Sequence, residues 1–220
     1  LHYDAKQWDL LESTSRSTVR VFPLKPASYY FGSVACNQLN KYQLALDFVD
    51  QGLLVIVEDP VLESDLLGQR GEAFFGMGQL EKGMVYYLQA IEMKESTSPY
   101  LCFNLCMNMY QYAFKLEKAL EILEGSEGLE LLYGAGDASF YLLKFDLLFE
   151  LQRYDKALKT LNKINSTEQS MLIDILIRRG DVAAKLLQRE DSLRFWKEAQ
   201  AMGASSEKLV KKIETGRYVE

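Results

Sequence analysis

One feature constrains the fold of this chain more than any other. A pair of residues, one small and one large, recurs at intervals of 35 to 38 residues. The small residues are Ala45, Gly83, Ala119, Ala157 and Ser192, and the large apolar residues four positions later are Val49, Tyr87, Leu123, Leu161 and Trp196. Residues four apart lie on one face of an α-helix. Each copy therefore predicts a helix whose small residue lets a second helix approach closely.

The clearest copy lies between Leu67 and Met93, where the pattern predicts two short amphipathic helices joined by a tight turn near Gly78. Gly71 is the small residue of the first helix, and Gly83 is the small residue of the second. Two helices pack closely when small residues lie where their axes cross. Such a hairpin cannot bury its apolar face alone, so we expect successive hairpins to stack side by side.

The pattern resembles the tetratricopeptide repeat, a helix–turn–helix unit of about 34 residues. The matching residues are Leu67, Arg70, Gly71, Phe74, Gly83 and Tyr87 in one copy, and Leu176, Arg179, Gly180, Ala183, Ser192, Trp196 and Ala199 in another. The resemblance, which is to bacterial members of the family, implies an all-α fold. This is a right-handed α-solenoid of about five helical hairpins, with an N-terminal half repeat and a C-terminal capping helix.

We interpret residues 1–220 as a single tetratricopeptide solenoid domain. The predicted elements are a partial repeat (1–23), five repeats (26–58, 61–95, 99–124, 137–165 and 167–202) and a capping helix (206–218). Prolines mark several boundaries, because the residue before a proline avoids helical geometry. The segment from Ser96 to Pro99 reads as a turn, and the glycine-rich stretch 125–136 is the most irregular region. Since the chain opens inside a partial repeat, we expect it to be the C-terminal part of a longer array.

The composition of the chain limits which binding partners and which cellular locations are expected. The net charge of −6 argues against nucleic acid, whose phosphates require clustered Lys and Arg. No apolar run approaches the ~20 residues of a membrane span. The three cysteines, Cys36, Cys102 and Cys106, do not suggest a disulfide framework. The bacterial cytoplasm and the periplasm or cell envelope both stay open as locations.

The sequence offers little for catalysis. Its single histidine, His2, stands near the start of the chain, which argues against histidine-dependent nucleophilic catalysis and most zinc sites. Cys102 and Cys106 share a helix face, but no second pair completes a metal site, so they favour core packing. We expect no enzyme activity, no cofactor and no metal.

In tetratricopeptide proteins the first helix of each hairpin lines a concave groove that receives an extended peptide or a partner helix, and the resemblance implies such a groove here. The helical period places these residues in it: Tyr30, Asn37, Phe75, Asn104, Asn108, Gln111, Tyr112, Asp146 and Phe149. Amide side chains bond main-chain groups and aromatic rings add contact area. The alternative is a polar helix face that only meets water. Asp65, Glu72, Asp146 and Asp181 make the expected groove acidic, which favours a neutral or basic segment.

The sequence therefore predicts a non-catalytic scaffold that binds a protein or peptide. One alternative is a structural or self-associating segment of a larger tetratricopeptide protein, whose groove is filled by its own chain or by another copy, as in a homo-oligomer. Another is a regulatory segment attached to a catalytic domain.

Overall fold

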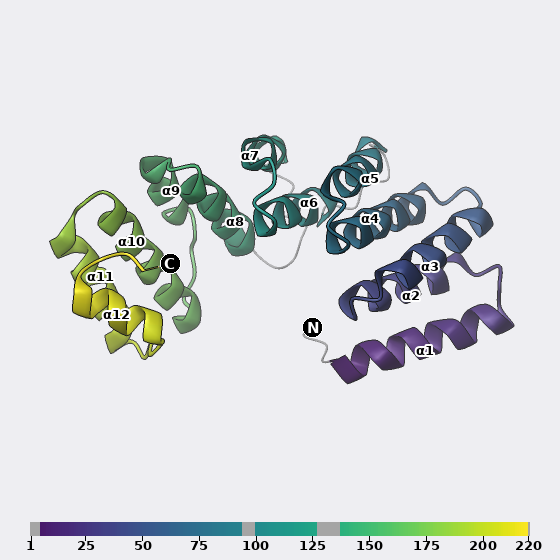
Figure 1. Cartoon of the computed structure of the whole chain (residues 1–220), viewed down its shortest axis with the longest axis horizontal. Helices are drawn as coiled ribbons and strands as arrows, with labels where there is room; N and C mark the ends of the chain where they lie inside the picture. The colour runs from purple at the N-terminus through teal and green to yellow at the C-terminus, as the bar shows by residue number, and fades with distance from the viewer. Residues whose placement is uncertain (1–4, 94–99, 127–136, 220) are drawn as a thin grey trace. The chain divides into compact units, whose positions relative to one another are not determined.

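The computed structural model describes residues 5–93, 100–126 and 137–219, and twelve α-helices account for most of them (Figure 1). The chain divides into two compact units, Leu1–Phe114 and Lys115–Glu220, and the boundary falls inside the segment predicted as the repeat 99–124. His2, the turn at 96–99 and most of the glycine-rich stretch lie outside the described residues. The repeat boundaries stay a prediction, whereas the all-α helical repeat fold is confirmed.

The described residues of each unit form six helices. The first unit contains α1 (Ala5–Val21), α2 (Pro26–Gln38), α3 (Tyr42–Val55), α4 (Pro60–Gly76), α5 (Leu80–Glu92) and α6 (Tyr100–Gln111). The second unit contains α7 (Leu116–Gly125), α8 (Asp137–Glu150), α9 (Tyr154–Leu161), α10 (Gln169–Lys185), α11 (Arg189–Ala201) and α12 (Glu207–Thr215). The pairs α2–α3, α4–α5, α8–α9 and α10–α11 pack as helical hairpins.

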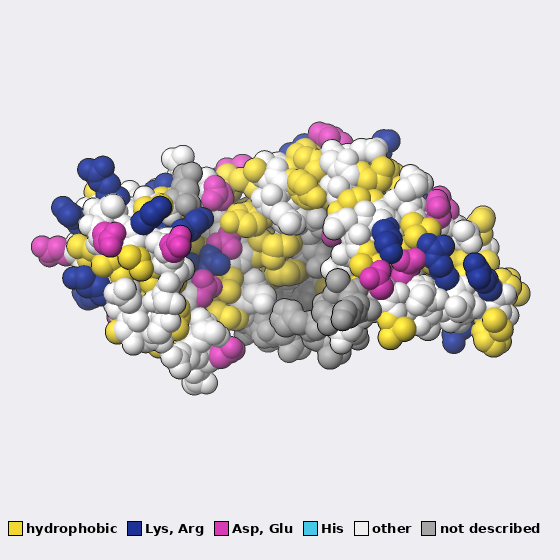
Figure 2. All heavy atoms as spheres, turned by 60° about the horizontal axis from the view of Figure 1, so that its bottom comes forward, with side chains coloured by type: hydrophobic (Ala, Val, Ile, Leu, Met, Phe, Trp, Pro, Cys, Tyr) yellow, Lys and Arg dark blue, Asp and Glu magenta, His cyan; other side chains and the backbone are white. Residues whose placement is uncertain are grey.

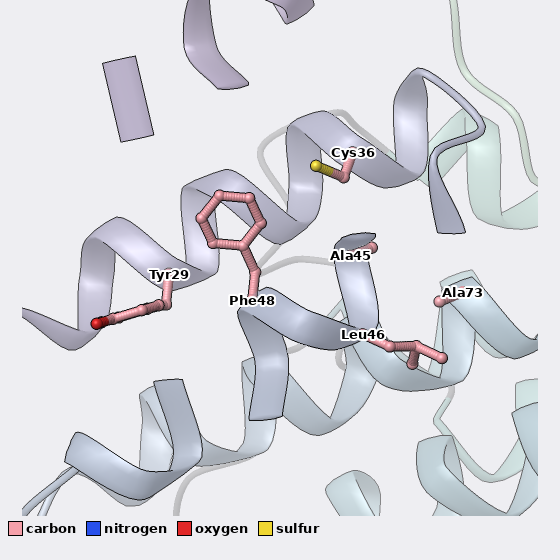
Figure 3. Packing of buried hydrophobic residues seen from close by; sticks show 6 residues of the cluster. All are labelled: Tyr29, Cys36, Ala45, Leu46, Phe48 and Ala73. Atoms are coloured by element: carbon pink, nitrogen blue, oxygen red, sulfur yellow. The ribbon is translucent and has the colours of Figure 1, made fainter. Parts of the chain in front are cut away.

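The recurring sequence pattern forms the core of these units. All five small residues and all five large residues of the pattern are buried. In the first hairpin the Phe48 ring points from α3 toward α2 and lies between Tyr29 and Cys36 (Figure 3). An ideal Cβ on Gly32 would lie 2.6 Å from this ring. Burial also raises the pKa of the Cys36 thiol to about 12, so this cysteine stays protonated and acts as an apolar packing group.

Gly71 and Gly83 mark the crossing of α4 and α5, as the sequence predicts. An ideal Cβ on Gly71 would lie 2.5 Å from Tyr87 Cδ2 and 3.0 Å from the Gly83 carbonyl oxygen. The relationship is reciprocal, since a Cβ on Gly83 would lie 2.5 Å from Phe75 Cδ2 and 3.0 Å from the Gly71 oxygen. Only residues without a side chain allow the two backbones this close an approach.

The first helices of these four hairpins, and also α6, end in the same way. The chain turns at a residue with a left-handed backbone, at Asn40, Gly78, Ala113, Gln152 and Leu187, whose φ values range from 48° to 74°. At Gly78, the Gln79 N–H donates to the Phe74 carbonyl and the Gly78 N–H donates to the Phe75 carbonyl, and the other four turns repeat this pair of bonds. The pair is a Schellman motif, which satisfies the last carbonyls of a helix. The sequence pattern predicts only the turn at Gly78. Asparagine, found at Asn40, also adopts this conformation, whereas Ala113, Gln152 and Leu187 are of residue types that rarely do.

In the first unit, α2 packs against α4, and α4 packs against α6. Side chains from these three helices reach one surface of this unit, and this surface carries the candidate site.

Candidate functional site

A groove with a volume of about 310 Å³ lies on this surface of the first unit. It is lined by Tyr30, Val34 and Gln38 of α2, Gln69 and Glu72 of α4, Tyr87 of α5, and Tyr100, Asn104, Met107, Asn108 and Gln111 of α6. We refer to this set as the polar groove. Four of the predicted site residues line it, namely Tyr30, Asn104, Asn108 and Gln111.

A hydrogen-bonded carboxylate forms the base of the polar groove. Glu72 Oε2 accepts from Tyr87 Oη at 2.5 Å and from Asn108 Nδ2 at 2.7 Å. The Asn108 amide also donates to the Asn104 carbonyl at 3.0 Å, and its side chain is 7% exposed. Its donor hydrogens are therefore already engaged within the fold. Asn108 fixes the base of the groove and has little left to offer a ligand.

Tyr87 is almost fully buried, and its hydroxyl remains a neutral donor. Burial raises the pKa of this phenol well above its ordinary value, and the neighbouring Glu72 carboxylate raises it further. A charged phenolate beside a carboxylate in this environment is strongly disfavoured. The hydrogen bond from Tyr87 to Glu72 is therefore present across the neutral pH range.

Two tyrosines pair at one side of the polar groove. Tyr30 Oη lies 3.1 Å from Tyr100 Oη. Burial raises the pKa of both phenols, and the Asp65 carboxylate contributes in the same direction. The paired hydroxyls give this side of the groove neutral donors and acceptors, and the exposed amide of Gln111 lies at the opposite end of α6.

Asn37 lies behind the groove and positions one of its lining residues. Its side chain is buried, and Nδ2 donates to both the Gln69 carbonyl and Gln69 Oε1 at 3.0 Å. Among the described residues, Asn37 Oδ1 is a buried side-chain atom without a hydrogen-bond partner. Asn37 therefore links α2 to α4, and Gln69, its partner, is the residue that reaches the groove.

Two further predicted residues of the first unit lie elsewhere. Phe75 has no exposed surface and packs at the crossing of α4 and α5, so its assignment to a groove is wrong. Tyr112 is 39% exposed and stacks on Phe75 with ring centroids 6.0 Å apart. Tyr112 follows the last residue of α6, and it is not among the residues that line the polar groove.

Asp146 and Phe149 belong to the second unit, on α8. Asp146 forms an ion pair with Arg178 of α10, which also lies 3.1 Å from Asp174. Burial raises the pKa of the Asp146 carboxyl although Arg178 opposes this shift. Phe149 packs against Phe145 and Tyr154, with ring centroids 5.7 Å and 5.4 Å apart.

Three of the four carboxylates that were expected to make the groove acidic are engaged by contacts within their own unit. Glu72 accepts two hydrogen bonds, and Asp146 is paired with Arg178. Asp181 accepts from Lys212 Nζ at 2.7 Å and from Trp196 Nε1 at 3.0 Å. The sequence indicates the carboxylates but not their partners, because these lie 31 to 36 residues away in Lys212, Arg178 and Asn108.

Sequence reasoning missed Gln38, Gln69, Tyr87, Tyr100 and Met107 as lining residues. A signal was available, since Gln38 stands four residues after Val34 and Gln69 stands three residues before Glu72, each one helical turn away.

The described residues include no group of three or more His, Cys, Asp or Glu side chains that is arranged to hold a metal ion. None of the described helices combines the length and hydrophobicity needed to cross a lipid bilayer.

Comparison of the sequence with protein-family models and with curated proteins gives no match. Solved structures do match. One of them is YrrB, which is described as a tetratricopeptide repeat protein with an unusual peptide-binding site. Its sequence is 14% identical to this chain and its TM-score is 0.67. The match covers 91% of this chain and 97% of the YrrB chain. PilF of Pseudomonas aeruginosa is 15% identical with a TM-score of 0.67, over 96% of this chain and 91% of its own.

A tetratricopeptide repeat protein from Parabacteroides merdae is 16% identical with a TM-score of 0.53, over 96% of this chain and 84% of its own. At these identities the similarity is one of fold. The chain has the helical repeat fold of these tetratricopeptide structures.

Proposed function

We propose that the first unit binds an extended segment of another protein in the polar groove. The observation that carries this proposal is the arrangement of side-chain amides above a fixed base. Gln38 and Gln111 are exposed and Asn104 is partly exposed, while Glu72, Tyr87 and Asn108 are locked together beneath them. Such a surface is organised before the ligand arrives, which reduces the entropic cost of binding.

The chemistry of these amides suits a peptide main chain. Each amide carries both a donor and an acceptor, as each peptide unit of an extended segment does. Since α2, α4 and α6 pack in sequence, Gln38 and Gln111 come from helices on opposite sides of α4. Tyr30 and Met107 add apolar contact area for side chains of the segment. Main-chain recognition of this kind accepts several sequences.

The similarity to solved tetratricopeptide structures supports the same function. One of these, YrrB, is described as having a peptide-binding site. Only the fold is shared with YrrB. Peptide binding by this chain is therefore argued from the side chains that line the polar groove.

Selection of peptides from a randomised library tests the proposal. The whole chain is immobilised, an enriched peptide is synthesised, and its affinity is measured for three proteins. We expect the Asn104→Ala/Gln111→Ala variant to bind at least about tenfold more weakly than the wild type, since it loses two hydrogen bonds. The matched control is Gln51→Ala, an exposed glutamine on α3 outside the groove, which should bind as the wild type does. Equal affinity for all three proteins contradicts the proposal.

A second candidate function is association with another copy of the chain. It is favoured by hydrophobic side chains exposed at one end of the first unit, visible in yellow in Figure 2. Val21, Phe22 and Leu24 lie where α1 passes into α2, and Leu54 and Val57 lie at the end of α3, with exposed fractions from 60% to 84%. Sedimentation over about a hundredfold range of concentration tests this candidate, since self-association depends on concentration. A monomer at every concentration excludes it.

A further inference from the structure

The chain reverses direction after its last helix. Gly216, the residue that follows α12, has a φ of +63° and donates its N–H to the Lys212 carbonyl at 2.9 Å. An ideal Cβ on Gly216 would lie 2.7 Å from Arg189 Nε, so both conformation and space favour glycine here. The segment that follows therefore returns across the second unit, and Figure 1 shows it in yellow, ending beside α10.

This returning segment places Tyr218 against three helices of the second unit. The ring centroid of Tyr218 lies 5.6 Å from that of Phe149 on α8. Lys185 Nζ, at the end of α10, lies 4.1 Å from the Tyr218 ring centroid, and Lys212 Nζ of α12 lies 5.0 Å from it. We refer to Phe149, Lys185 and Lys212 as the Phe149 site. An aromatic ring with a cation near its face is a favourable arrangement.

Contacts with residues other than Tyr218 hold Phe149 and Lys212 in place. Asp181 accepts two hydrogen bonds from Lys212, at 2.7 Å and 2.8 Å, and a third from the Trp196 indole. The Lys212 side chain is only 8% exposed, so its ammonium group has little freedom to move. Phe149 is packed from behind by Phe145 and Tyr154. These two residues of the site are therefore preorganised for an aromatic ring.

We propose that the Phe149 site binds a tyrosine or tryptophan side chain of an extended protein segment, and that Tyr218 is an internal occupant that such a segment must displace. The electron-rich rings of these residues interact most favourably with the two ammonium groups. Tyr218 itself remains partly exposed and belongs to a short segment beyond the last helix, so an external ring can exchange with it. This proposal does not depend on the polar groove, because all of its residues lie in the second unit.

A titration followed by nuclear magnetic resonance tests this proposal in the whole chain. The chain has two tryptophans, so the indole N–H of Trp196 gives one of only two signals in its spectral region. The probe is a synthetic peptide with the sequence of residues 215–220, and the control peptide carries alanine in place of its tyrosine. Because Trp196 donates to Asp181, which holds Lys212, its signal reports on the Phe149 site.

We expect Tyr218→Ala to shift the Trp196 signal and the tyrosine peptide to shift it back, with no effect of the control peptide. Wild type should require about tenfold more peptide, since the internal ring competes at the millimolar effective concentration of a tethered group. Adding Phe149→Leu to Tyr218→Ala should weaken peptide binding at least about tenfold. Arg217→Ala, which keeps Tyr218, should behave as the wild type.

Three results overturn the proposal. These are equal peptide binding by wild type and Tyr218→Ala, indifference to Phe149→Leu, and a wild-type Trp196 signal that changes with protein concentration. The last result would mean that Tyr218 fills the site of a second copy. If Tyr218→Ala alters the far-ultraviolet circular dichroism, Tyr218→Leu replaces it, because leucine keeps the apolar contact and removes the aromatic ring.

Discussion

Tyr87 donates a hydrogen bond of 2.5 Å to Glu72 from the opposite helix of the same hairpin, in a place where the phenol is almost fully buried. Asn108 of α6 bonds the same carboxylate oxygen at 2.7 Å. Three helices are thus joined through one carboxylate. The relationship explains why the base of the polar groove is rigid, and it connects the stability of the first unit to the ionisation of one tyrosine.

Tyr87→Phe tests this connection through the dependence of stability on pH. The pKa of Tyr87 is raised in the folded chain, so its contribution to stability is fully present below the unfolded value of about 10 and is lost as pH rises above it. At pH 7 we expect Tyr87→Phe to lower the free energy of unfolding by about 1–3 kcal/mol. Urea denaturation at pH 11 should show a smaller difference between the two proteins. A constant difference would contradict the assignment.

Asn108→Ala should act on stability, whereas Gln111→Ala should not. Asn108 is buried and bonds Glu72, so its loss leaves the carboxylate with one partner fewer and should cost about 1–3 kcal/mol. Gln111 is exposed, and its replacement should change stability by less than about 0.5 kcal/mol. Thermal denaturation of the two variants distinguishes these roles. Equal melting temperatures would mean that the network does not stabilise the fold.

Gly71→Ala and Gly83→Ala should both destabilise the first unit. In each case the new methyl group would meet an aromatic ring at 2.5 Å and a backbone oxygen at 3.0 Å, and the backbone cannot yield as a side chain can. Overpacking of this kind costs about 1–3 kcal/mol. Gly125→Ala in α7 is the matched control, because its added Cβ would have nothing within 4 Å. Denaturant midpoints for the three variants provide the measurement, and an unchanged midpoint for either crossing glycine would contradict the packing.

Leu187→Gly should leave the chain equally stable or make it more stable, by up to about 1 kcal/mol, although it removes a large side chain. Leu187 is 90% exposed and adopts a φ of +61°, a conformation that costs about 1–2 kcal/mol for a residue with a Cβ. Gly78→Ala is the reverse test at the equivalent turn. Its Cβ would have open space, so conformational strain alone should lower the melting temperature. A loss of stability in Leu187→Gly would argue against the shared turn geometry.

The sequence predicts the fold well because the fold depends on local spacing. The small residue and its large partner four positions later, such as Ala157 and Leu161, are both buried in every copy. The positions where helices end are harder to predict from residue spacing. Leu187, in the turn after α10, adopts a conformation that its side chain does not favour, so the tertiary context determines the turn.

The candidate site was only partly predictable. The helical period identifies which face of α6 turns inward, and Asn104 and Asn108 both lie there. It does not reveal that Asn108 is engaged by a carboxylate 36 residues earlier, or that Phe75 lies at a helix crossing. Nor does it reveal that Phe149 is in contact with Tyr218. These relationships depend on contacts between distant segments, which spacing within one helix does not encode.

The most direct test of the proposed function is a calorimetric double-mutant cycle on a peptide selected against the whole chain. The peptide and its counterparts methylated at single main-chain nitrogens are titrated into wild type and Asn104→Ala/Gln111→Ala. If the polar groove reads the main chain, at least one methylation should weaken binding to wild type about tenfold and have little further effect on the variant. Equal losses in both proteins, or no loss in either, would contradict main-chain recognition by the polar groove.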